Sequence, residues 1–198
     1  MGGFGGSIKN LAMGCASIKG KYLQHSEYVP KVDENLCNLC GKCVENCGYT
    51  AIKKGKNSIY FIGENCIGCG ECVIMCRYGA IGPKVPKEIK GLQEKMVEYL
   101  MGIINQKKGK IIYMNFLIDI SPGCDCYSLS NAPILEDLGI LLSDDPIAID
   151  KASADLINKQ CGVDKFKVIY KDIDWKWQLD YGRQMGIGNE KYEIINLP

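Results

Sequence analysis

Two runs of cysteines share one spacing: CNLCGKCVENC at residues 37–47 and CIGCGECVIMC at residues 66–76. In each run, two residues separate the first three cysteines from one another, and a fourth cysteine follows after three more. Behind each run a tyrosine and an Ala-Ile pair recur at one offset: Tyr49, Ala51, Ile52, Tyr78, Ala80 and Ile81. Chance does not produce so long a match, so the sequence predicts two copies of one small unit related by a pseudo-two-fold axis.

This cysteine pattern is typical of cubane iron–sulfur clusters. Such a cluster is held by four thiolates, and in two-cluster ferredoxins the fourth cysteine of each run binds the cluster of the other run. The sequence therefore predicts two [4Fe–4S] clusters whose ligands cross between the copies. Cluster 1 takes Cys37, Cys40, Cys43 and Cys76, and cluster 2 takes Cys66, Cys69, Cys72 and Cys47. Gly41, Gly68 and Gly70 suit loops that curl round a cluster, because glycine permits positive φ.

Zinc and disulfides are the alternatives for these cysteines. Structural zinc sites prefer paired C-x2-C knuckles, so the third and fourth cysteine of each run are redundant for zinc. A disulfide scaffold requires an oxidising compartment, and the N-terminus lacks the basic and apolar regions of a secretory signal. No apolar run approaches the roughly 18 residues that a spanning helix needs. We therefore expect a cytoplasmic protein without membrane insertion, whose cysteines are reduced or bound to metal.

Charge and periodicity suggest an ordinary globular chain. The 24 basic and 23 acidic residues give a formal net charge of +1, and the scattered lysines indicate no nucleic-acid partner. The expected fold class is α+β or α/β. We expect a Gly-rich segment at residues 1–34 that packs on the rest or on a partner, a two-cluster ferredoxin-like domain at 35–85, and an α/β domain at 86–198.

The last zone shows recognisable element patterns. Apolar spacing predicts helices at residues 88–107 and 175–185, and β-branched or apolar runs predict a buried strand at 111–120 and further strands at 166–170 and 192–197. Asp145 before Pro146 predicts an N-cap and a helix that reaches about Gln160 and stops at Gly162.

Two family resemblances follow from these motifs. Residues 37–82 resemble a bacterial-type two-cluster ferredoxin, although Gly48 and Arg77 stand where a proline usually follows the fourth cysteine. Nearly the whole chain resembles the domain-of-unknown-function 362 family of iron–sulfur proteins. The matching stretches are GFGGSIKN at 3–10, His25-Ser26, CDC at 124–126, DPIAID at 145–150, GIG at 186–188 and Tyr192-Glu193. Members usually carry an α/β region ahead of the GFGG stretch, so the resemblance implies a separate chain that supplies this half.

Several weaker sites remain open. Cys124, Asp125 and Cys126 follow the strand expected at 111–120, and could bind another metal with Cys15 or His25, or supply a reactive thiolate. Packing is the plain alternative for such cysteines. The glycine-rich residues 2–7 could bind an anion, or could be a flexible or packed end. His25 could act in acid–base chemistry or be structural. Asp144, Asp145 and Asp150 could form an acidic site, although helix capping already explains Asp145.

Three functions compete at this stage. The leading hypothesis is an electron-transfer module of a larger redox system, in which two clusters relay electrons to redox protein partners. The alternative is an oxidoreductase whose clusters feed a site near Cys124 and Cys126, because a free ferredoxin needs no further domain of this size. In the third hypothesis, the clusters have only a structural role: they stabilise the fold or hold a partner protein.

Overall fold

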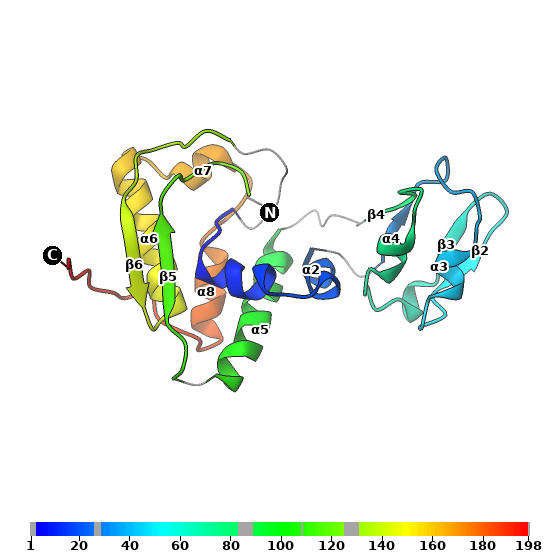
Figure 1. Cartoon of the computed structure of the whole chain (residues 1–198), viewed down its shortest axis with the longest axis horizontal. Coiled ribbons are helices and arrows are strands. Elements are labelled where there is room, and N and C mark those ends of the chain that lie inside the picture. The colour runs from blue at the N-terminus through cyan, green and yellow to red at the C-terminus, as the bar shows by residue number, and fades with distance from the viewer. Residues whose placement is uncertain (1–2, 26–28, 83–88, 108, 125–130, 198) are drawn as a thin grey trace. The chain divides into compact units, whose positions relative to one another are not determined.

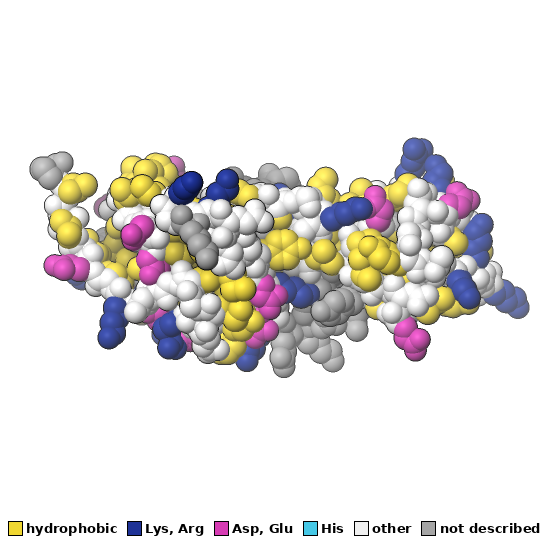
Figure 2. Space-filling view, turned by 90° about the horizontal axis from the view of Figure 1, so that it is seen from below, with side chains coloured by type: hydrophobic (Ala, Val, Ile, Leu, Met, Phe, Trp, Pro, Cys, Tyr) yellow, Lys and Arg dark blue, Asp and Glu magenta, His cyan; other side chains and the backbone are white. Residues whose placement is uncertain are grey.

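The computed structural model describes residues 3–25, 29–82, 89–107, 109–124 and 131–197. Its contacts divide the chain into two compact units. The cysteine unit is Ala16–Glu88, and the C-terminal unit joins Met1–Cys15 to Ile89–Pro198. Charged side chains of both signs are spread over both units among apolar ones, as Figure 2 shows for one face. In the described residues, no helix combines the length and apolarity needed to cross a bilayer.

The cysteine unit is built from short elements that exchange strands between the two copies (Figure 1). After helix α2 (Ile18–His25), the first copy contains β1 (Lys31–Val32), α3 (Lys42–Glu45) and β2 (Ile52–Lys54). The second contains β3 (Ile59–Phe61), the 3-10 turn η2 (Gly63–Asn65), α4 (Glu71–Met75) and β4 (Ile81–Gly82). Strand β1 pairs with β4 and β2 pairs with β3, both antiparallel. Each two-stranded sheet therefore joins the first strand of one copy to the last strand of the other.

The backbone repeats with the sequence offset of 29 residues that separates Cys37 from Cys66. Val32 pairs with Ile81, and the equivalent pair one copy on is Phe61 with Ile52. Positive φ angles recur at equivalent positions: Leu39 and Gly68, Gly41 and Gly70, Thr50 and Gly79. The glycine prediction is thereby confirmed, since Gly41, Gly68 and Gly70 have φ of 82°, 70° and 72°. The duplicated sequence folds as a duplicated backbone.

The C-terminal unit packs helices on one face of an antiparallel pair of strands. Strand β5 (Tyr113–Leu117) pairs with β6 (Gly139–Ser143), and α6 (Pro146–Cys161) contacts both. Helix α5 (Lys90–Gln106) packs on α8 (Trp177–Gln184), with α7 (Lys165–Ile169) against α6. The core between them contains Met96, Leu100, Ile147, Trp175 and Leu179, among others. Small antiparallel sheets with helices to one side make the fold class α+β.

The N-terminal segment belongs to this second core. Phe4 is buried, and its ring lies 5.3 Å from Phe166 in an edge-to-face arrangement and 6.1 Å from Trp175. Helix α1 (Ser7–Lys9) and the π-helical turn η1 (Asn10–Gly14) follow, and η1 packs on α5. Residues 3–7 of the glycine-rich stretch are therefore a packed segment of the C-terminal unit.

Local sequence signals account for helix α6. The Asp145 carboxylate accepts hydrogen bonds from the backbone N–H groups of Ile147 and Ala148 at 2.8 and 2.9 Å, and Pro146 occupies the first turn. Gly162 ends the helix with φ of 69°. The predicted cap and stop are confirmed. The expected helices at 88–107 and 175–185 are also present, as α5 and α8.

Three strand predictions need correction. Residues 166–170 lie in helix α7, which begins after Asp164, whose side chain accepts from the backbone N–H of Lys167 at 3.1 Å. Residues 192–197 form no strand, because no neighbouring strand pairs with them among the described residues. The strand predicted at 111–120 exists as β5, but only one face is buried. Tyr113 and Leu117 point into the core, whereas Met114 and Phe116 are exposed.

Candidate metal centre

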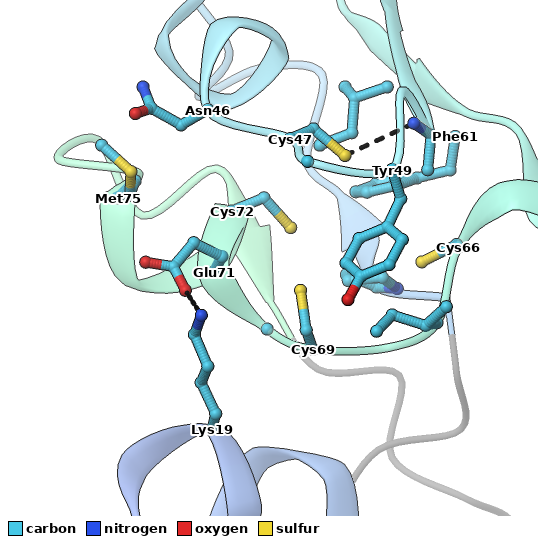
Figure 3. Close-up of a pocket in the computed structure, with 16 residues that line it drawn as sticks. Lys19, Asn46, Cys47, Tyr49, Phe61, Cys66, Cys69, Glu71, Cys72 and Met75 are labelled. Carbon is cyan, nitrogen blue, oxygen red and sulfur yellow. Dashed lines mark hydrogen bonds and ion pairs between the residues drawn. The ribbon is translucent and has the colours of Figure 1, made fainter.

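One pocket of the cysteine unit is lined by cysteines from both copies (Figure 3). It has a volume of about 250 Å³. Cys66, Cys69 and Cys72 come from the second copy, and Cys47 comes from the first. These are the same four residues that the sequence assigns to cluster 2. Their sulfur atoms are directed toward one space, into which the ring of Tyr49 also projects.

Short elements place these four thiols. Cys66 follows the turn η2, and Cys72 lies on helix α4. Cys69 sits between Gly68 and Gly70, whose positive φ angles turn the loop tightly around the pocket. Cys47 follows helix α3 and precedes β2, and its sulfur accepts a hydrogen bond from the backbone N–H of Ala51 at 3.3 Å.

The rest of the lining is mostly apolar. Pro30, Ala51, Ile52, Phe61 and Met75 contribute side chains to the wall. At the rim, Lys19 of α2 forms an ion pair with Glu71 at 2.7 Å. An apolar wall around half-buried thiols limits the access of water to a thiolate-bound group.

Burial affects the pKa of one of these thiols, Cys72. It raises the pKa of Cys72 to about 12, and the nearby Cys66 and Cys69 raise it further. Without metal, Cys72 is therefore a neutral thiol at neutral pH. A metal that binds there must displace the thiol proton, as thiolate ligation requires. Cys72 is thus a donor for a metal group and not a reactive thiolate.

The other four predicted ligands lie around the first copy. Burial raises the pKa of Cys43, and the neighbouring Cys40 and Cys37 also raise it, which shows that these three thiols lie near one another. Cys76 of the second copy packs against the same apolar cluster as Cys37 and Cys43. Cys43 is buried and Cys40 is exposed. Cys47 and Cys72 pack against this apolar cluster too, so Cys76 meets Cys37 and Cys43 at a core that both copies share.

The cysteines fit a cluster as its donor set. In the described part of the chain, no three His, Cys, Asp or Glu side chains are grouped closely enough to hold a metal ion. The thiolates of a cubane bind separate iron atoms, whereas the ligands of a zinc site converge on one ion, with Zn–S about 2.3 Å. Three observations support the fit to a cluster. Cysteines of both copies line one pocket, the glycines of the ligand loops have positive φ, and the Ala51 N–H donates to Cys47 Sγ.

Comparison with protein families identifies the family to which the chain belongs. Residues 1–155 match the model of a family described as "Domain of unknown function (DUF362)". The chain belongs to the DUF362 family. No protein of curated function matches it significantly. The family match covers the GFGGS segment, both cysteine runs, the CDC stretch and most of helix α6, so the sequence resemblance to this family is confirmed.

The cysteine pair outside the repeat is only partly described in this DUF362 chain. Asp125 and Cys126 lie outside the described residues. Cys124 is half-buried after β5, and its sulfur lies 3.1 Å from the Nζ of Lys9 on helix α1. Cys15 belongs to the C-terminal unit and is exposed. His25 belongs to the cysteine unit, where its Nδ1 contacts the Lys21 carbonyl at 2.7 Å.

The candidate acidic and anion sites are occupied by internal bonds. Asp145 caps α6 and also accepts from the backbone N–H of Asn189 at 2.8 Å. Asp150 is fully buried and accepts from the backbone N–H groups of Ser7 and Ile8 at 2.7 and 3.0 Å. These two N–H groups are therefore engaged within the fold and are not available to an external anion. Asp144 is exposed beside the cap, so the three aspartates do not form an open acidic site.

Two functional-site neighbours escaped the sequence analysis. Lys19 and Tyr22 lie on α2, ahead of the repeat, and contact its second copy through Glu71 and Gly70. Nothing in their spacing relates them to the cysteines. Only the fold brings them together.

Proposed function

We propose that this DUF362 chain is an iron–sulfur electron-transfer protein whose two [4Fe–4S] clusters act as a relay. Cys37, Cys40, Cys43 and Cys76 hold cluster 1, and Cys66, Cys69, Cys72 and Cys47 hold cluster 2. Each cluster accepts one electron and passes it on. Four thiolates per cluster leave no open iron position, so substrate does not bind at the clusters. Their potentials fall in the roughly −700 to +450 mV range of such clusters, set by charge, hydrogen bonds and exposure.

One observation carries this proposal: Cys47 lines the pocket of the other copy's three cysteines. Three ligands from one run and a fourth from the other are the arrangement of a two-cluster ferredoxin. A zinc knuckle pairs its ligands two by two instead. The proposal therefore makes the fourth cysteine of each run a ligand of the opposite cluster.

Anaerobic purification, followed by iron and sulfide analysis and an EPR-monitored redox titration, tests the relay. We expect about eight irons and eight sulfides per chain, as two cubanes require, and two reversible couples. Colourless protein or one zinc per run would overturn the proposal. A protein that carries both clusters but shows no couple would favour a purely structural role.

Cysteine variants test the crossover. We expect Cys47→Ser to perturb the same EPR signal as Cys69→Ser, and Cys76→Ser to perturb the same signal as Cys40→Ser. Cys161→Ser is a matched control, because Cys161 lies in the C-terminal unit at the end of α6. If Cys47→Ser grouped instead with Cys40→Ser, each run would hold its own cluster and the crossover would be wrong.

We further infer that a partner chain with an α/β half covers the outer face of β5 and β6. Met114 is opposite Leu142 and Phe116 is opposite Ile140, and these four side chains are 52–60% exposed. None of these positions carries a charge. Exposed apolar patches mark interaction surfaces.

The proposed partner at the outer face of β5 and β6 can be tested with a charged substitution. Phe116→Lys should weaken co-purification of the partner without loss of iron, because Phe116 lies in the C-terminal unit and not beside the cysteines. Tyr99→Lys, on a partly exposed position of α5, is the control. A chain that purifies alone, with a Phe116→Lys variant that behaves like the wild type, would remove the basis for this partner.

A second candidate function is an oxidoreductase with a site at Cys124. The contact between Lys9 Nζ and Cys124 Sγ at 3.1 Å favours it, because a neighbouring ammonium stabilises a thiolate. An extra stoichiometric metal that is lost in Cys124→Ser while both clusters remain would support this candidate. Unchanged metal content, together with equal alkylation rates of Cys124 in the wild type and Lys9→Met, would argue against it.

A further inference from the structure

Helix α2 lies outside the cysteine repeat and contacts its second copy at Glu71 and Gly70. Within the cysteine unit, Lys19 pairs with Glu71 of the second copy. The ring of Tyr22 lies over Gly70, such that a Cβ at position 70 would stand 2.2 Å from Tyr22 Cδ1. Gly70 separates Cys69 from Glu71 in the loop that turns around the pocket. Tyr22 therefore covers the ligand loop of the proposed cluster 2.

The Tyr22 hydroxyl is buried without a partner. Its oxygen is shielded from solvent and makes no hydrogen bond to any residue in the part of the chain that the structure describes. A buried hydroxyl without a partner carries a free-energy penalty, and such groups in native proteins generally point to a partner that is not yet present. Burial and the nearby thiols of Cys72 and Cys66 raise the pKa of Tyr22 to about 12. The hydroxyl is thus an unpartnered donor on the side chain that covers the Gly70 loop.

The equivalent loop of the first copy has a different cover. Gly41 corresponds to Gly70, and there the neighbour is the end of the Lys54 side chain, at 2.6 Å from a Cβ built at position 41. Lys54 is exposed and belongs to β2 of the repeat itself. The nearest atoms to that Cβ belong to Lys54 and Glu45. The two ligand loops therefore share a positive φ at the equivalent glycines but differ in the side chains that cover them.

We propose, on the basis of the two-cluster function, that the Tyr22 hydroxyl donates a hydrogen bond to a sulfur atom of cluster 2. Reduction adds negative charge to the cluster and its sulfur atoms, so a donor stabilises the reduced form more than the oxidised form and raises the potential. Tyr22 is then a positioning and tuning residue that makes cluster 2 easier to reduce and leaves cluster 1 unaffected. Helix α2 becomes a functional part of the cluster unit.

The test compares Tyr22→Phe with the wild-type holoprotein in an EPR-monitored redox titration. Cys69→Ser identifies the signal of cluster 2. We expect the potential of cluster 2 to fall in Tyr22→Phe, that of cluster 1 to stay unchanged, and the iron count to remain at the wild-type value. Tyr60→Phe, at an exposed position of β3, is the matched control and should shift neither potential.

Resonance Raman spectra give an independent readout. Transfer into D2O should shift Fe–S stretching bands more in the wild type than in Tyr22→Phe, because one exchangeable donor is missing in the variant. Equal potentials and equal isotope shifts in the two proteins would overturn the inference, and so would loss of iron in Tyr22→Phe, which would assign Tyr22 to packing alone. A wild-type chain without two clusters would instead refute the proposed function, whatever the variant does.

Discussion

Replacing Asp150 with alanine removes the acceptor that holds helix α1 on helix α6. Asp150 Oδ1 accepts from the Ser7 backbone N–H and hydroxyl, both at 2.7 Å, and from Asn115 Nδ2 at 2.8 Å, while Oδ2 accepts from the Ile8 N–H at 3.0 Å. In the variant, Asn115 keeps its bond to the Ser153 hydroxyl at 2.9 Å. The Ser7 hydroxyl keeps a contact with Asn115 Oδ1 at 3.3 Å. The backbone N–H groups of Ser7 and Ile8 lose the Asp150 carboxylate, which is their hydrogen-bond acceptor.

These two orphaned donors set the size of the effect. A buried donor left unsatisfied costs roughly 1–3 kcal/mol, so two cost roughly 2–6 kcal/mol. The variant no longer buries the Asp150 carboxylate, and burial raises the pKa of that carboxyl while the bonds from Asn115, Ile8 and Ser7 lower it. The relief of that burial offsets part of the loss. We expect Asp150→Ala to lower the free energy of unfolding by about 3 kcal/mol.

Urea denaturation followed by tryptophan fluorescence measures this change in one unit. The chain's two tryptophans, Trp175 and Trp177, both lie in the C-terminal unit. Asp144→Ala is the matched control, because Asp144 is exposed, and it should change the free energy of unfolding by less than about 0.5 kcal/mol. A loss below about 1 kcal/mol for Asp150→Ala would refute the reasoning, since it would mean that water or another group satisfies the freed N–H groups.

The remaining predictions concern the cluster loop, the aromatic core and the helix cap. Gly70→Ala should release iron from cluster 2, because φ is +72° and the new Cβ meets the Tyr22 ring, whereas Gly48→Ala, with nothing within 4 Å, should retain all iron on chemical analysis. Phe4→Ala should lower the free energy of unfolding of the C-terminal unit by about 3 kcal/mol in the tryptophan assay, and an equal loss in the exposed Phe116→Ala would contradict this. Asp145→Ala should lower the midpoint of the same urea transition by an amount equivalent to about 1–2 kcal/mol, as loss of an N-cap does. An unchanged midpoint would show that the cap is dispensable.

Local signals explain which elements of the C-terminal unit could be read from the sequence. Helix α6 was predictable because its cap, its first-turn proline and its terminal glycine are adjacent in the chain to the elements they control. The strand prediction at residues 166–170 was wrong because phenylalanine, valine, isoleucine and tyrosine, which these residues contain, are all common in strands. Asp164 in fact caps a helix there, and it also accepts from Trp175 Nε1 at 3.1 Å. Tertiary packing decided between the two structures.

Distant contacts explain what the sequence could not supply. Asp150 meets Ser7 across 143 residues, and no local pattern distinguishes such a carboxylate from an exposed one on the same helix. Tyr22 is similar, since its relation to Gly70 arises only when α2 folds back on the second copy. The cysteine pattern could be recognised from the sequence because the full spacing is contained within each of the two runs.

Strand exchange gives a physical reason for the crossing of the fourth cysteine. Cys47 stands shortly before β2, and β2 pairs with β3 of the second copy. The chain is therefore drawn to the second copy just after Cys47, which delivers that thiol to the pocket of Cys66 and its neighbours. The same offset places Cys76 before β4, which pairs with β1 of the first copy. If the proposed ligand sets hold, the strand pairs and the ligand sets are one arrangement. A variant that breaks the pairing of β2 with β3 should then loosen the proposed cluster 2 even when all eight cysteines of the two runs are intact.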